Sequence, residues 1–289
     1  MKANVLSPQF EPRERSPLAP IAYDPTRPAA PGYRSSESRA GKVLRPLDQL
    51  SRTRDHFYST RILTRGSRSP SQISRYVFEG EQLSESPIRI GIFAGLHGDD
   101  AVGPGAVSTF LTDLVALPHL GDGLRIYAYP IVSAVNFETA TPSSRPSQYI
   151  INQMGHEMMS SETYQIEREI FAIAFDGIIT ISLEKEIENF QVGVSDPRLQ
   201  EILVRPILSA LEPFLPDIED CDPRRSLTGG IRLKQRPFEL SLRVPSTGWS
   251  GLYALALEIA LHTAVDCYRS YMMQKRSSRL PMTSELQAA

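Results

Sequence analysis

Few cysteines, little net charge and only short apolar runs mark this sequence of 289 residues. Cys221 and Cys267 lie far apart and outside any Cys-x-x-Cys pair, which argues against a thiolate zinc site or a redox motif. Lys and Arg number 31 against 33 Asp and Glu, so no global field attracts nucleic acid or an anionic membrane. Apolar runs of about 18 residues are missing, and so is a secretory signal, so we expect a cytoplasmic protein.

Proline, arginine, serine and alanine dominate residues 1–42, which show hardly any apolar periodicity. Such a segment cannot offset the entropy of ordering, so we expect a disordered leader there. We expect the folded domain to span residues 43–274 and a polar tail to follow over residues 275–289. The basic leader could also act as a partner-binding arm.

Strand-like and helix-like segments alternate along the expected domain. Two alternating segments, FYSTRILTRG and ISRYVFEG, predict antiparallel strands at a sheet edge, and the apolar IRIGIFAG predicts a central strand covered on both faces. Amphipathic helices and further apolar strands, DGIITISL and FELSLRV among them, then follow. The order predicts an α/β fold with a mixed, mostly parallel central sheet and helices on both faces.

Three segments fall at the carboxyl ends of predicted strands, where ligands of such sheets bind: GLHGDD, SLEKE and LRVPS. His97 and Asp100 in the first segment have a spacing that lets an imidazole and a carboxylate meet at one ion. Asp99 or Asp100 could equally cap the helix that follows. His262, inside the last apolar helix, is expected to be a hydrogen-bonded core histidine.

The segment RIGIFAGLHGDDAVGPGAVSTFL resembles the strand, His-Gly-x-Glu turn and helix of zinc carboxypeptidases and of their aspartoacylase and succinylglutamate desuccinylase relatives. Further on, YPIVSAVNFE resembles a Pro-x-x-Asn-Pro-x-Gly-Phe loop of that family, and SETYQIEREI resembles the helix before its second zinc histidine. The order of motifs covers roughly Phe57 to Tyr271. The resemblance implies a zinc carboxypeptidase-like, phosphorylase/hydrolase-like fold, a zinc ion held by His-x-x-Glu and a later His, and a Glu as general base.

At the metal and base positions the chain departs from that pattern. His97 matches the first ligand, Asp100 stands at the family's Glu, and Glu184 stands at the second His. Arg243 occupies the position of the general base, and a guanidinium that stays protonated cannot accept a proton from water. Hydrolysis by the family's route is therefore expected to be lost.

The carboxylate-binding positions of the family are altered as well. Asn152 matches the family's Asn, Gln153 replaces its Arg, and Arg145 lies about two positions from a second substrate-binding Arg. These three residues are the candidates for substrate binding. The expected ligand is a peptide or an N-acyl amino acid.

A single change explains these substitutions together: a positively charged side chain takes the place of the zinc ion. We expect the Arg243 guanidinium to bridge Asp100 and Glu184 in place of zinc, so that the cofactor implied by the resemblance is absent. This predicts a catalytically silent binder of a peptide or N-acyl amino acid. Two alternatives stay open: an active amide hydrolase with the altered ligands His97, Asp100 and Glu184, and an interaction protein that acts through its leader.

Overall fold

The computed structural model describes residues 38–64, 71–82, 86–96, 98, 100–139, 161–215, 217–221, 237–247 and 250–278. All of them belong to one compact unit, Glu37–Ala289. Its helices are α1 (Arg39–Leu50), α2 (Val102–Ala116), α3 (Ala134–Thr139), α4 (Ser161–Ile173), α5 (Arg205–Leu211) and α6 (Ser250–Ser277), and its strands are β1 (Phe57–Thr64), β2 (Ser71–Glu79), β3 (Ile88–Phe93), β4 (Leu124–Tyr129), β5 (Gly177–Glu184), β6 (Phe190–Val194), β7 (Ile218–Asp220) and β8 (Phe238–Pro245).

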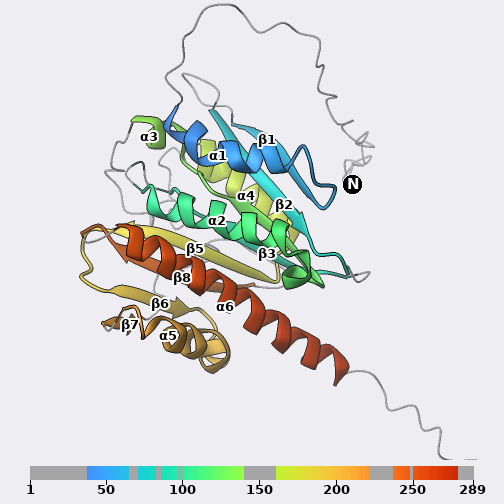
Figure 1. Ribbon diagram of the computed structural model, residues 1–289, viewed down its shortest axis with the longest axis vertical. Coiled ribbons are helices and arrows are strands. Elements are labelled where there is room, and N and C mark those ends of the chain that lie inside the picture. Colours follow the sequence, from blue (N-terminus) through green and yellow to red (C-terminus); the bar gives the residue numbers. More distant parts are fainter. Residues whose placement is uncertain are drawn as a thin grey trace, which may run out of the picture. The chain divides into compact units, whose positions relative to one another are not determined.

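The strands form one mixed sheet in the order β1-β2-β4-β3-β5-β8-β6-β7. Four neighbouring pairs are parallel, namely β4 with β3, β3 with β5, β5 with β8, and β6 with β7. The pairs β1–β2, β2–β4 and β8–β6 are antiparallel. The sheet is thus mixed and mostly parallel, as the sequence pattern predicts, with the antiparallel β1–β2 pair at one edge (Figure 1).

Helices cover both faces of the sheet (Figure 1). On one face α1, α2, α5 and α6 contribute buried side chains to the main core, including Leu47, Phe110, Ile207 and Leu257. On the other face Ile166 and Ile170 of α4 join a second core with Phe93 and Tyr129. The strand β3 lies between the two cores, which explains its almost wholly apolar sequence.

Both ends of the folded region differ from the sequence-based boundaries. The helix α1 begins at Arg39, four residues before the expected domain start at Val43. The Ser38 hydroxyl accepts a hydrogen bond from the Gly41 amide and caps this helix, a signal that the Arg- and Ser-rich composition of the region concealed. At the other end α6 continues to Ser277, into the segment expected to be a polar tail.

Pro206 divides the helical region before β7, as its missing N–H predicts. A 3-10 turn (Pro197–Leu199) and a π-helical turn (Gln200–Val204) precede α5, and Pro206 lies in the first turn of α5. The sequence reading missed β6 and β7, which have five and three residues. Short strands beside charged segments give too few alternating positions for a periodicity to show.

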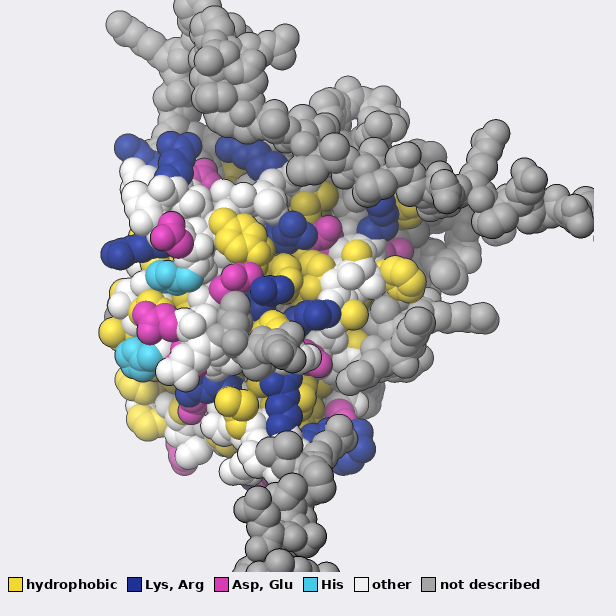
Figure 2. All heavy atoms as spheres, turned by 90° about the vertical axis from the view of Figure 1, so that its right-hand side faces the viewer, with side chains coloured by type: hydrophobic (Ala, Val, Ile, Leu, Met, Phe, Trp, Pro, Cys, Tyr) yellow, Lys and Arg dark blue, Asp and Glu magenta, His cyan; other side chains and the backbone are white. Residues whose placement is uncertain are grey.

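None of the described helices is long and apolar enough to cross a membrane. Figure 2 shows one face of the molecule, on which acidic, basic and hydrophobic side chains are interspersed among the described atoms.

Candidate functional site

The connections leaving β3 change the direction of winding at its carboxyl end. From β3 the chain passes through α2 to β4 on one side, and it later returns to β5 on the other side of β3. Ligands of open α/β sheets bind where the direction of winding changes in this way. The turn after β3 and the carboxyl ends of β5 and β8 therefore form the candidate functional site.

Strand register brings Glu184 and Arg243 to the same face at this end of the sheet. Ser182 of β5 pairs with Arg243 of β8, and Glu184 follows Ser182 by two residues. Because side chains alternate between the faces of a strand, these three side chains share one face. It is the face of Ile178, which packs in the core of α4.

An ion pair joins Arg243 and Glu184. Arg243 Nε lies 3.7 Å from Glu184 Oε1, and the two side chains are only 11% and 13% exposed. The Ser182 hydroxyl donates a hydrogen bond of 3.1 Å to the same carboxylate oxygen. The guanidinium is thus paired with Glu184, one of the two carboxylates of the expected bridge. Arg243 Nη2 is buried and meets no hydrogen-bond acceptor among the described residues.

Asp100 is buried in the turn that leads into α2. Its Oδ1 accepts a 2.9 Å hydrogen bond from the backbone amide of Gly103, in the first turn of the helix. This is the capping role that the sequence allowed for it. A Cβ atom added to Gly103 would lie 2.9 Å from Ile181 Cγ2 and 3.0 Å from Asp100 Oδ2, so glycine permits the close packing of α2 on β5. A contact between Arg243 and Asp100 stays a prediction.

Arg39, which the sequence did not single out, holds the turn after β3. Its guanidinium donates hydrogen bonds to the carbonyl oxygens of Gly98, at 2.7 Å, and Phe137, at 3.1 Å. The same group lies 4.5 Å from the centroid of the Phe137 ring. Glu138 in turn accepts bonds from the first amides of α1. No pattern of spacing could have revealed an interaction across so much sequence.

Four predicted site residues lie outside the described residues. They are the metal-ligand candidate His97 and the substrate-binding candidates Arg145, Asn152 and Gln153. Their roles stay predictions. The structure brings together Ser182, Glu184 and Arg243, and it describes Asp100 in the turn before α2.

The described part of this site suits zinc poorly. A zinc ion bound by Glu184 would lie beside a guanidinium that already faces the carboxylate. Like charges at such separations repel strongly in a partly buried site. The donor set at the strand ends therefore fits a bound cationic side chain better than a dication.

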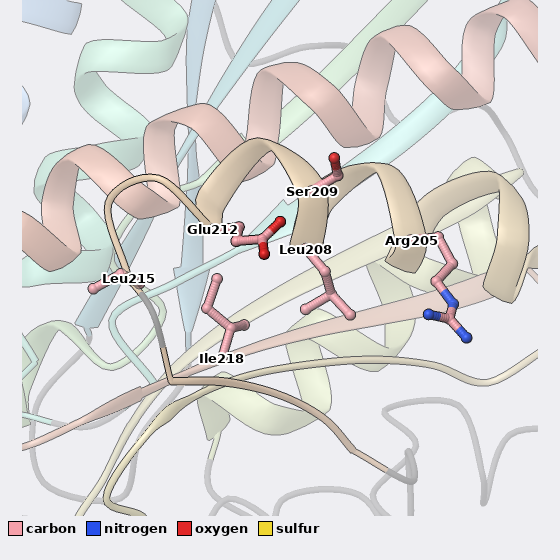
Figure 3. Close-up of a pocket in the computed structure, with 6 residues that line it drawn as sticks. All are labelled: Arg205, Leu208, Ser209, Glu212, Leu215 and Ile218. Carbon is pink, nitrogen blue, oxygen red and sulfur yellow. The ribbon is translucent and has the colours of Figure 1, made fainter.

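A separate pocket of about 430 Å³ opens between α5 and the edge strand β7 (Figure 3). Leu208 and Ile218 point toward one another across it, and Arg205 lies toward the start of the helix. The remaining lining residues are Ser209, Glu212 and Leu215. Its place at the sheet edge separates it from the carboxyl ends of β3 and β5, so it is not part of the candidate site.

Comparison by sequence finds no matching family model and no matching curated protein. Solved structures do match the fold. A metallo-carboxypeptidase from Burkholderia cenocepacia has a TM-score of 0.61 at 12% identity, over 81% of this chain and 69% of that one. A metallo-carboxypeptidase from Pseudomonas aeruginosa, in complex with (2-guanidinoethylmercapto)succinic acid, has a TM-score of 0.59 at 10% identity, over 77% of this chain and 67% of that one. Thrombin activatable fibrinolysis inhibitor has a TM-score of 0.58 at 10% identity, over 80% of this chain and 73% of that one. The chain therefore has a metallo-carboxypeptidase-like fold, as its motifs predicted.

Proposed function

We propose that this chain, on a metallo-carboxypeptidase-like fold, binds the carboxylate of a peptide or an N-acyl amino acid without hydrolysing it. The binding site lies at the carboxyl ends of β5 and β8. Arg243 is its principal recognition group.

The observation that carries the proposal is the ion pair of Arg243 with Glu184. The guanidinium Nε lies 3.7 Å from Glu184 Oε1, while Nη2 has no hydrogen-bond acceptor among the described residues. A buried donor without an acceptor costs about 1–3 kcal/mol, which a ligand oxygen would recover. Guanidinium binds carboxylates through two parallel N–H groups, so a ligand carboxylate is the complementary partner. Because Nη2 is buried, ligand entry requires a local rearrangement.

The same arrangement disfavours hydrolysis. An amide hydrolase of this kind needs a group that accepts a proton from the attacking water, and Arg243 remains protonated at any working pH. Glu184 could serve as a base only if it were released from the guanidinium beside it. The Asp100 carboxylate is engaged with the first turn of α2. An altered metal hydrolase would therefore require the site to be rebuilt.

A structural neighbour suggests a chemical probe. The Pseudomonas aeruginosa metallo-carboxypeptidase forms a complex with a guanidino derivative of succinic acid, a compound with two carboxylic acid groups. We include this compound among the ligands to be tested, with N-acetyl amino acids and dipeptides. A carboxylate is the group common to all three.

Isothermal titration calorimetry of the full chain tests the proposal. The wild type should bind at least one of these carboxylates, and Arg243→Met should weaken binding by about tenfold to a hundredfold because a charge-assisted hydrogen bond is lost. Arg243→Lys keeps the charge but loses the fork, so its affinity should lie between the two. Arg75→Met is the matched control, since Arg75 forms a similar part-buried pair with Glu169 far from the strand ends of β8. Equal affinities in wild type and Arg243→Met would refute the assignment.

A further inference from the structure

A second group of potential metal ligands lies where α2 and α6 pack together. The two helices run side by side over the main core (Figure 1). Asp113 comes from α2, while Glu258 and His262 come from α6 and are separated by four residues. Residues four apart lie on the same face of a helix, so both side chains of α6 face the α2 carboxylate together.

The separations within this group suit a metal ion. One potential ligand atom of each residue lies within 4.8 Å of those of the other two. His262 Nε2 and Asp113 Oδ2 are 3.2 Å apart. Bonds of about 2.0–2.2 Å in a tetrahedral site put neighbouring ligand atoms about 3.4 Å apart. The His–Asp separation of 3.2 Å is close to this value, and Glu258 supplies the third potential ligand atom.

Packing holds the imidazole in place. The ring of His262 meets the buried ring of Phe110 at a centroid distance of 4.8 Å, in an edge-on arrangement. His262 is hydrogen-bonded, as the sequence predicts, but its side chain is 31% exposed and so lies at the rim of the core. All three residues are half-buried, which leaves solvent access for water as a fourth ligand.

We infer that Asp113, Glu258 and His262 form an exchangeable site for a divalent transition-metal ion. The imidazole nitrogen favours zinc, cobalt or nickel over magnesium and calcium, which prefer oxygen ligands alone. The two carboxylates together carry two negative charges, which balance the charge of a divalent ion, and the imidazole is neutral. The site is distinct from the strand-end site, because Asp113 lies eleven residues beyond Val102, where α2 begins, or about 17 Å along the helix.

This site changes how a metal analysis of the protein must be read. Zinc found in the purified chain would come from the α2–α6 site, even with the strand ends free of metal. A metal measurement on the strand ends therefore needs a variant in which His262 or Asp113 has been replaced. The inference is independent of the proposed binding function, since neither site contributes a residue to the other.

Titration of the metal-stripped full chain with Zn²⁺ by calorimetry, and with Co²⁺ by visible absorption, tests the inference. We expect one ion per chain in the wild type, and His262→Gln and Asp113→Asn should each weaken binding by at least about tenfold. Asp113→Asn preserves side-chain shape, so a folding defect of one variant does not decide the outcome. His119→Gln, which removes another histidine, should bind like the wild type. A wild type that binds neither ion, or variants that bind as tightly as the wild type, would overturn the inference.

Discussion

Removing the guanidinium of Arg243 should destabilise the fold through Glu184. We expect Arg243→Met to lower the free energy of unfolding because the Glu184 carboxylate, only 13% exposed, loses the cation beside it. Replacing Glu184 by Gln as well should restore part of the loss. The neutral amide still has an oxygen that can accept the hydrogen bond of the Ser182 hydroxyl, but it carries no charge that needs a counterion.

The geometry sets the size of the effect. Two unit charges 3.7 Å apart interact by roughly 4 kcal/mol at an effective dielectric of 20. Desolvation of both groups and loss of side-chain entropy offset part of this attraction. We therefore expect Arg243→Met to cost about 3 kcal/mol and the coupling between the two positions to be about 1–3 kcal/mol.

Urea unfolding followed by circular dichroism measures all four members of this double-mutant cycle. The coupling energy is obtained from the wild type, Arg243→Met, Glu184→Gln and the double variant at one pH and ionic strength. A coupling below about 0.5 kcal/mol, within the range of independent sites, would refute the view that the two side chains stabilise each other.

Two further predictions concern the glycines of α2 and the buried hydroxyl group of Tyr129. Gly103→Ala should cost about 1–3 kcal/mol in urea unfolding because its methyl group would lie 2.9 Å from Ile181 Cγ2. Gly105→Ala in the same helix meets open space and should stabilise by up to about 1 kcal/mol; equal effects of both changes would contradict this view of α2. Burial and the adjacent Glu169 raise the pKa of Tyr129, so the stability it contributes is present below its unfolded pKa of about 10 and is lost as pH rises further. Tyr129→Phe should therefore reduce the fall in unfolding free energy between about pH 9 and about pH 11, and an unchanged slope would refute the assignment.

Hydrophobic patterning was sufficient to predict most of the fold. The edge pair β1–β2 and the central strand β3 follow from alternating and continuous apolar runs. The short strands β6 and β7 were not predicted, because three to five residues do not establish a period.

The site was predictable only where strand register determines it. Arg243 and Glu184 end neighbouring parallel strands, so a motif comparison could place them together before the contact was seen. Arg39 reaches the turn after β3 from a helix far earlier in the chain, and Asp113 meets His262 from another helix. Such contacts depend on tertiary packing, which local sequence does not encode.

We propose that Arg243 makes the carboxyl ends of β5 and β8 a site that binds carboxylates without hydrolysing the ligand. This proposal is tested by incubating the His262→Gln protein with N-acetyl amino acids and dipeptides in the presence of Zn²⁺. Mass spectrometry then measures whether these compounds are cleaved. We predict that the ligands stay intact while calorimetry detects their binding. Release of free amino acids by this variant, abolished when Glu184 is changed to Gln, would contradict the account.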